Sequence, residues 1–183
     1  MDFIDYVTLM LINMAAGLGI LAGFLWKDIA GPNRQRWAPA FGAPGLVATV
    51  CGFAMIFSWP LPNPYNIAYG EMSILLGVLF LGAAWGLARQ WDLMPLGWYA
   101  VPAGAVAVLT GIRFLNLGLT NSPALSATGF ILTGAAGVFA PMVLLKPSER
   151  FTRRIGTFVL LAAAGIWAFI ACMAYWAHLK PAG

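Results

Sequence analysis

Residues 155–177 read IGTFVLLAAAGIWAFIACMAYWA, a run without a single charged side chain. A helix rises about 1.5 Å per residue, so this run is long enough to cross the roughly 30 Å hydrocarbon core of a bilayer. The whole chain has the same character, with 183 residues of which 61% are hydrophobic and only 9% charged, and a mean hydropathy of +0.83. Soluble domains carry about 25% charged residues. The composition therefore predicts an integral membrane protein.

Five further apolar runs are long enough, or nearly long enough, to span a membrane. The six expected spans are approximately residues 4–26, 38–58, 72–88, 93–119, 125–145 and 155–177. They lack the strict alternation of barrel strands, and a backbone in lipid must satisfy its hydrogen bonds internally, so we expect helices. The sequence predicts an all-α bundle of six transmembrane helices, in one domain that covers residues 1–183.

Basic residues are divided unequally between the two ends of the expected bundle. Arg113 and Lys180 belong to one end, and the eight others follow the first, third and fifth spans: Lys27, Arg34, Arg36, Arg89, Lys146, Arg150, Arg153 and Arg154. Cytoplasmic connections of membrane proteins are enriched in Lys and Arg, so we expect the end with eight to be cytoplasmic and both termini to lie outside. Orientation and lipid headgroups explain this charge, and no nucleic-acid partner is indicated.

The spans resemble one another as three tandem helix hairpins. GVLFLGAAW from Gly77 is similar to GFILTGAAG from Gly129, and Gly52, Gly111 and Gly165 recur in the second members of the hairpins. Two helices restore the direction of the chain, so such a repeat would be parallel, as in some transporters. Because Gly and Ala are common in membrane helices, a close-packing role explains the same residues, and both interpretations stay open.

The segment between the second and third spans, residues 59–71, reads WPLPNPYNIAYGE. Its three prolines favour an extended chain, and its asparagines can satisfy exposed backbone groups. We expect an ordered cap over the outer end of the bundle rather than a loose connector. Candidate binding residues gather near it in the expected topology: Trp59, Tyr65, Asn66, Tyr69, Glu71, Arg113, Asn116 and His178.

Arg113 lies within the outer half of the fourth span if that span extends to Leu119. A charge at such a depth is costly unless it is paired or hydrated, and Glu71 is the acidic residue best placed to pair with it. Alternatively, Arg113 reaches the lipid headgroups while Glu71 favours the positive end of the third helix. Asn13 lies near the middle of the first span, where its amide must form a hydrogen bond, and it joins the candidate set.

Four stretches of the sequence resemble a known family. They are the cap WPLPNPYNIAYGE, the opening FIDYVTLMLINMAAGLGILAGF, the segment GLTNSPALSATGFILTGAAGV and the closing AYWAHL. The chain is similar over essentially its whole length to the family numbered 981 among the domains of unknown function. The resemblance implies a small multi-pass protein of the prokaryotic cytoplasmic (inner) membrane, and it carries over no catalytic residues.

The sequence lacks the residue patterns that most catalytic chemistry requires. The single histidine excludes a bis-histidine haem or a His-rich metal site, and the two cysteines form no CxxC motif. There is no HExxH motif, no glycine-rich phosphate loop after a strand, and no paired-carboxylate site. We therefore expect no enzyme, no catalytic residue and no metal site, and the sequence identifies no cofactor.

Two classes of function remain after these exclusions. In the first, which we prefer, the bundle binds or passes a small solute, an ion or a lipid-like molecule through the polar cluster near the outer face. In the second, the protein is a non-catalytic accessory subunit of a larger membrane complex that holds a lipid, quinone or pigment. The expected partners are the lipid bilayer, a small-molecule ligand, and either further copies of the chain or that larger complex.

Overall fold

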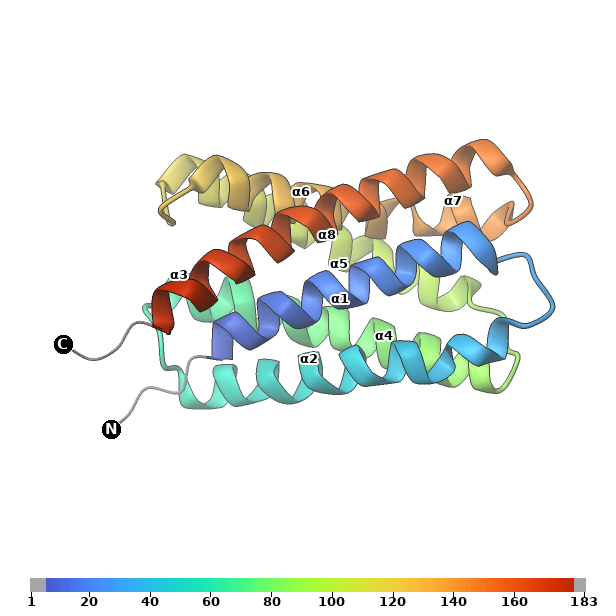
Figure 1. Ribbon diagram of the computed structural model, residues 1–183, viewed down its shortest axis with the longest axis horizontal. Helices are drawn as coiled ribbons and strands as arrows, with labels where there is room; N and C mark the ends of the chain where they lie inside the picture. The colour runs from blue at the N-terminus through green and yellow to red at the C-terminus, as the bar shows by residue number, and fades with distance from the viewer. Residues whose placement is uncertain (1–5, 180–183) are drawn as a thin grey trace.

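The computed structural model describes residues 6–179, except for the side chains of Tyr6 and Asn63. All regular structure in this part of the chain is helical (Figure 1). The helices are α1 (Tyr6–Lys27), α2 (Ala38–Ser58), α3 (Asn63–Tyr65), α4 (Met72–Ala88), α5 (Met94–Leu117), α6 (Pro123–Val138), α7 (Ala140–Leu145) and α8 (Arg150–His178). A 3₁₀ turn at Arg34–Trp37 precedes α2, and a π-helical turn at Asn66–Glu71 leads into α4.

Six helical segments of the described chain are long and apolar enough to cross a membrane. They comprise residues 7–27, 34–58, 66–88, 94–117, 123–145 and 150–178. The predicted all-α fold with six transmembrane helices is therefore confirmed. The third span extends back to Asn66 through the π-helical turn, and the fifth consists of α6 and α7, which are separated at Phe139. The sixth begins at Arg150, so its first turn carries basic side chains.

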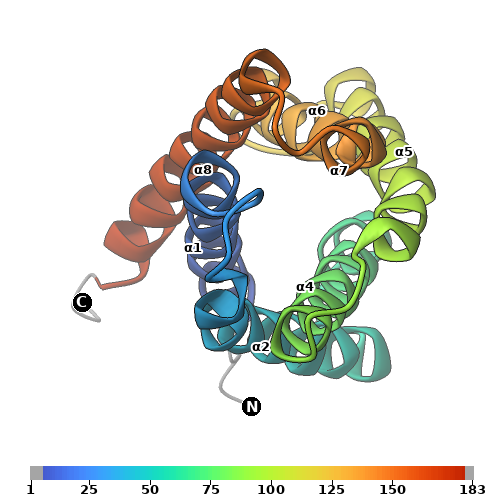
Figure 2. The same cartoon turned by 90° about the vertical axis from the view of Figure 1, so that its right-hand side faces the viewer.

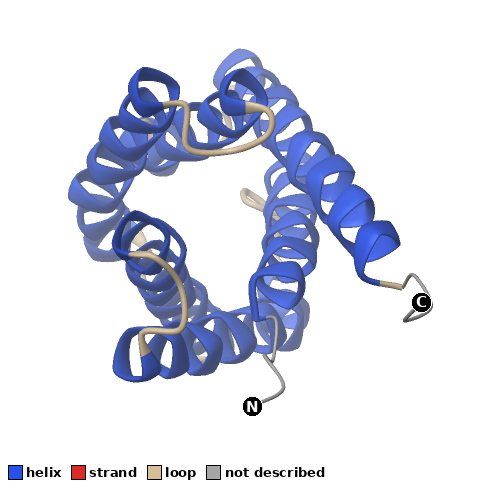
Figure 3. Cartoon of the chain, turned by 90° about the vertical axis from the view of Figure 1, so that its left-hand side faces the viewer, coloured by secondary structure: helices blue, strands red, loops and turns tan. Residues whose placement is uncertain are grey.

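The six spans stand around a ring, as Figures 2 and 3 show from opposite ends. The order is α1, α2, α4, α5, α6 with α7, and α8, and α8 closes the ring on α1. The most extensive contacts join α2 to α4, α5 to α6, and α8 to α1. Each of these pairs joins the second helix of one sequential hairpin to the first helix of another. The same pattern of contact thus occurs three times around the ring.

Small residues allow two of these pairs to pack with their backbones in contact. A Cβ added to Gly104 on α5 would lie 2.4 Å from the carbonyl oxygen of Gly134 on α6. A Cβ added to Gly77 on α4 would lie 2.7 Å from the backbone nitrogen of Thr49 on α2. No larger side chain fits at such distances, so glycine at these positions sets the separation of the helices.

The two ends of the ring carry different chemistry. The start of α1, the end of α8, the segment before α4 and the α5–α6 connection lie together at one end, here named the termini end (Figure 1). The connections after α1, α4 and α7 lie at the other end, here named the basic end because these connections and the adjoining helix ends carry the eight clustered basic residues. This arrangement separates the candidate cap from the charged connections by the length of the helices.

Candidate functional site

The segment between α2 and α4 is an ordered cap at the termini end of the ring. The amide nitrogen of Leu61 donates a hydrogen bond to Asn66 Oδ1 at 3.1 Å, and Asn66 Nδ2 donates to the carbonyl oxygen of Leu61. Asn66 is completely buried, so its carboxamide satisfies both backbone groups of Leu61 inside the protein. Asn66 therefore has a structural role in the cap, rather than that of a ligand-binding side chain.

The cap contributes Tyr65 and Tyr69 to an aromatic cluster toward the termini end of the ring. We define the aromatic cluster as Tyr65, Tyr69, Phe114, Phe130 and Trp167, which come from the cap, α5, α6 and α8. The ring centroids of Tyr69 and Phe114 are 6.0 Å apart, those of Phe114 and Phe130 are 5.2 Å apart, and those of Phe130 and Trp167 are 4.9 Å apart. These are the spacings of packed aromatic rings, so the cluster joins the cap to α5, α6 and α8 near this end.

Two hydrogen bonds fix the edges of the aromatic cluster. Tyr65 donates its hydroxyl proton to the carbonyl oxygen of Leu119, just beyond α5. Trp167 Nε1 donates to Thr133 Oγ1 at 3.0 Å and so joins α8 to α6. The polar atoms of both large side chains are therefore paired although the rings are packed in an apolar environment.

The charged members of the predicted polar cluster lie elsewhere. Glu71 and Arg113 are both exposed, and they form no ion pair with each other. The expectation of a Glu71–Arg113 pair is therefore wrong. The reason is helical periodicity: Tyr69 and Phe114 occupy the inward faces of their elements, so Glu71 and Arg113 face outward. Asn116 and Trp59 are exposed as well.

The two remaining candidates, His178 and Asn13, connect helices. Thr8 Oγ1 lies 3.4 Å from His178 Nδ1, so the end of α8 contacts the start of α1. Asn13 Nδ2 donates a hydrogen bond to the carbonyl oxygen of Pro44 at 2.9 Å, which joins α1 to α2. Within residues 6–179, the structure therefore pairs neither His178 nor Asn13 with Glu71 or Arg113.

A cavity that the sequence did not predict lies inside the ring. Its volume is about 560 Å³, and it is lined by residues of every span. Its lining runs from Met14, Met72 and Phe130 on the side of the termini end to Ile29 and Phe151 at the basic end. Phe130 of the aromatic cluster therefore borders the cavity. The small residues that line the cavity on α5 and α6 are of the same kind that pack helices together, so the sequence could not distinguish a cavity from a helix contact.

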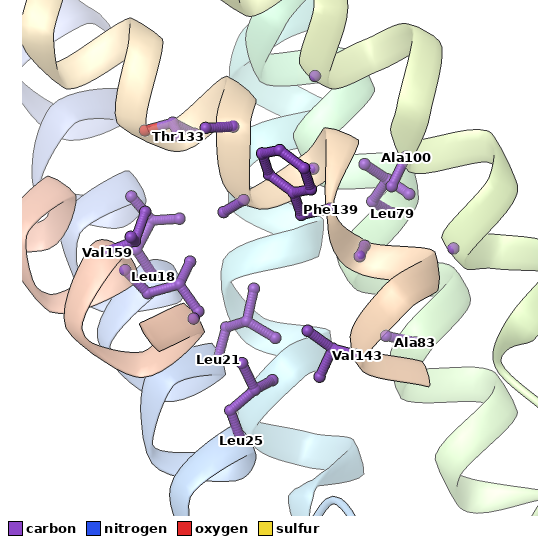
Figure 4. A pocket seen from close by; sticks show the side chains of 18 of the residues that line it. Leu18, Leu21, Leu25, Leu79, Ala83, Ala100, Thr133, Phe139, Val143 and Val159 are labelled. Atoms are coloured by element: carbon purple, nitrogen blue, oxygen red, sulfur yellow. The ribbon is translucent and has the colours of Figure 1, made fainter. Parts of the chain in front are cut away.

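The lining of the cavity is almost entirely apolar (Figure 4). Among the described residues that line it, Thr133 and Thr152 alone have a polar side chain. The hydroxyl of Thr133 donates to the carbonyl oxygen of Gly129 at 2.8 Å and accepts from Trp167. An apolar cavity offers water almost no hydrogen bonds and tends to stay dry. The interior is thus suited to uncharged or apolar molecules and unsuited to ions.

Phe139 projects into this cavity from the break between α6 and α7. Pro141 follows closely and has no N–H group to continue the helical hydrogen bonds, so a break here is expected. Figure 4 shows the Phe139 ring between the side chains of Leu18 and Val159 and those of Leu79 and Ala100. Although it lines the cavity, Phe139 is 56% exposed, so little of its ring is packed.

A separate polar arrangement stabilises the connection after α1 at the basic end. Arg36 Nη2 donates to Asp28 Oδ2 at 2.5 Å, and Trp37 Nε1 donates to the same oxygen at 2.7 Å. These hydrogen bonds, together with the charges of Arg36 and Lys27, hold the pKa of Asp28 below its ordinary value against the opposing effect of burial. Among residues 6–179, no three His, Cys, Asp or Glu side chains are grouped as metal ligands would be.

The comparisons with known proteins agree with this architecture. The cryo-EM structure of the Helicobacter pylori urea channel in its closed state is similar, with a TM-score of 0.75 and 16% sequence identity. The match covers 95% of this chain and 100% of that channel chain, so the whole fold is shared. None of the curated proteins matches the sequence. A family described as a protein of unknown function, DUF981, matches residues 1–181, and the chain is a multi-pass membrane protein that belongs to this family.

Proposed function

We propose that this protein is a channel for a small uncharged solute, in which the central cavity is a vestibule and the aromatic cluster is a closed barrier. The observation that carries the proposal is the position of the cavity, which lies on the axis of the ring and ends at the aromatic cluster. Its fold neighbour is a channel for urea, a small uncharged molecule, solved in a closed state. This similarity of fold supports solute passage, but at 16% sequence identity it does not identify the solute.

The chemistry of the lining defines the class of solute. An ion that entered the cavity would lose its hydration shell and gain no charged or strongly polar partner there, since the lining side chains are apolar apart from two threonines. An uncharged amide or hydroxyl still loses roughly 2–7 kcal/mol without a compensating hydrogen bond. Passage therefore favours small uncharged molecules, and among them those with fewer hydrogen-bonding groups, such as formamide before urea and glycerol. Narrow apolar passages in channels exclude ions by the same effect.

The distribution of charge suggests the orientation of the channel. The positive-inside rule assigns the basic end to the cytoplasm and both termini to the outside. The vestibule then faces the cytoplasm of a prokaryotic cell, and the aromatic cluster lies in the outer half of the inner membrane. The cap, which carries Tyr65 and Tyr69, forms the outer cover of the barrier.

A second candidate is an accessory subunit in a larger membrane complex. It is favoured by the outward-facing Glu71 and Arg113, because charges exposed at the depth of a membrane-spanning helix are costly unless headgroups, water or another protein meet them. Glu71→Gln separates the two candidates. Normal solute passage and normal assembly support the channel, whereas dissociation of a complex with foreign subunits supports the accessory role.

The direct test is passage of solutes through proteoliposomes that contain the purified protein. After an osmotic step, stopped-flow light scattering measures entry of urea, formamide or glycerol, and a fluorescent dye measures entry of Na⁺. We expect faster entry of at least one uncharged solute than in protein-free vesicles, and no increase for Na⁺. Conduction of Na⁺ with no effect on the uncharged solutes would overturn the proposal.

A further inference from the structure

The lining of the central cavity is most exposed at the boundary between α7 and α8. Among the described residues that line the cavity, four are exposed: Phe139, Met142, Phe151 and Ile155. Phe139 and Met142 belong to the break before α7 and to α7 itself, whereas Phe151 and Ile155 belong to the start of α8. Exposure is thus confined to the two sides of one helix boundary, and these four residues define the side opening.

The packing of α7 explains why the ring is open at this boundary. After the break at Phe139, α7 packs mainly on α5 and contacts α8 only sparsely. By contrast, α6, which is the first part of the same span, contacts α8 extensively. The two helices therefore separate toward the basic end, and the connection 146–149 bridges them there. The opening faces the hydrocarbon region, because all four of its residues are apolar and belong to membrane-spanning segments.

The dimensions of the cavity correspond to those of one membrane leaflet. Along α8 its lining extends from Phe151 to Leu160, nine residues apart. At about 1.5 Å per residue this is a depth of about 14 Å. The hydrocarbon core of a bilayer is roughly 30 Å thick, so one leaflet accounts for about half of it. The dry, apolar interior thus has the length and the chemistry that one acyl chain requires.

The rim of the side opening carries exposed positive charge. Lys146, Arg150 and Arg154 are exposed beside the opening, and Glu149 is the acidic residue of that connection. Arg153 is already engaged, because its Nε donates to the carbonyl oxygen of Leu25 at 2.9 Å. Basic residues at the end of a membrane helix attract the phosphate groups of anionic lipids. The rim therefore complements a negative headgroup where the chain would enter.

We propose that the side opening binds one anionic phospholipid from the leaflet at the basic end. One acyl chain enters the cavity between α7 and α8, and Lys146, Arg150 and Arg154 hold the phosphate. This inference goes beyond solute passage, since a chain occupies the cavity whether or not a solute crosses the ring. If the protein is a channel, the bound chain fills the vestibule and reduces passage.

The first experiment locates the lipid chain by photolabelling. The protein is reconstituted with phosphatidylglycerol that carries a diazirine near the end of one chain, and adducts are mapped by peptide mass spectrometry. We expect adducts on Leu18, Leu79 and Val159, which line the cavity. Adducts confined to Phe158 and Leu161, exposed residues of α8 that do not line it, would overturn the proposal.

Two matched variants separate a specific site from general contact with lipid. Val159→Trp obstructs the cavity beside Leu18 and should strongly reduce adducts on Leu18 and Leu79, whereas Leu161→Trp on the exposed face of the same helix should leave them unchanged. Persistent cavity adducts in Val159→Trp would contradict the assignment. Binding is read from adducts rather than from transport, so its failure is distinguishable from failure of the channel proposal.

The headgroup is tested with a second lipid and a change of charge. Photoreactive phosphatidylcholine with the same chain should label the cavity several-fold less than phosphatidylglycerol. The double variant Lys146→Glu with Arg150→Glu should remove this preference, whereas Arg89→Glu, on the connection between α4 and α5, should retain it. Equal labelling by the two lipids in the unmodified protein would overturn the assignment of an anionic lipid.

Discussion

The indole nitrogen of Trp167 on α8 donates a hydrogen bond to the hydroxyl of Thr133 on α6 at 3.0 Å. Trp167 is completely buried and meets Phe130 edge-on within the aromatic cluster, whereas Thr133 lines the central cavity. The two residues therefore join the proposed barrier to the wall of the proposed vestibule. Their hydrogen bond fixes the position of the indole ring at the point where the cavity ends.

Removal of this hydrogen bond should loosen the barrier. Trp167→Phe retains a large aromatic ring but loses the donor, and Thr133 still donates to the carbonyl oxygen of Gly129. We expect solute entry into proteoliposomes to increase several-fold, and the free energy of unfolding to fall by about 0.5–1.5 kcal/mol, the net value of one hydrogen bond. Trp98→Phe, an exposed tryptophan of α5, is the matched control. Equal entry rates in the two variants would contradict a barrier role for the bond.

The cap should depend on the carboxamide of Asn66. Asn66→Ala leaves both the N–H and the carbonyl group of Leu61 without their partner in a mostly buried segment. We expect a loss of about 1–3 kcal/mol, which corresponds to the cost of an unsatisfied buried polar group, and a melting temperature lower by several degrees. Thermal unfolding in detergent, followed by circular dichroism, measures the change. Asn116→Ala, at an exposed amide of α5, should leave the melting temperature unaltered.

The glycines should divide into those that set helix separation and those that do not. Gly134→Ala places a Cβ 2.5 Å from the carbonyl oxygen of Gly104, so α5 and α6 must move apart and we expect strong destabilisation. Gly165→Ala on α8 meets no atom within 4 Å, and alanine has the higher helix propensity, so its effect should be neutral or stabilising. The melting temperatures of the two variants test this difference between the two glycines. Similar melting temperatures would show that close backbone contact is unimportant here.

The sequence could predict the helices because hydropathy and length are local properties of the chain. The span at residues 38–58 is a continuous helix over those same residues. The cap is ordered as expected, but its residues 63–71 are helical, whereas its prolines had favoured an extended chain. The burial of Tyr69 depends on ring contacts with Phe114 and Phe130 on distant helices, which no local pattern encodes. Asn66 instead bonds the backbone of Leu61 within the cap, in the role that the sequence suggested for its asparagines.

The charged residues of the expected site show more clearly what the sequence alone could not predict. The sequence identifies Glu71 and Arg113 as charges that are costly within a membrane. It cannot show which way their side chains point, because that depends on which face of each helix joins the ring. In the ring, the small residues of α5 and α6 also form two different surfaces. Gly104 and Gly134 form a helix contact, while Ala103 and Ala136 line the cavity, although Ala136 belongs to the same GFILTGAAG stretch as Gly134. A cavity arises from the closure of six helices and could not be inferred from any one of them.

Acid should weaken the connection between α1 and α2 through Asp28. The hydrogen bonds from Arg36 and Trp37 lower the pKa of Asp28 in the folded protein below its ordinary value of 3.8. Between the two pKa values the unfolded chain binds more protons than the folded one, so the ionised carboxylate stabilises the fold. This contribution is complete above the unfolded pKa and is lost as the pH falls below about 4, through the folded pKa.

The variant Asp28→Asn tests this dependence directly. Its amide retains an oxygen for the indole of Trp37 but loses the ion pair with Arg36, so we expect a lower melting temperature at pH 7 and a smaller difference from the unmodified protein as the pH falls below about 4. Glu149→Gln is the control, because the exposed carboxylate of Glu149 forms no ion pair within residues 6–179. The measurement is thermal unfolding in detergent from pH 7 to pH 3. A gap between Asp28→Asn and the unmodified protein that stays constant over this range would show that ionisation of Asp28 does not stabilise the fold.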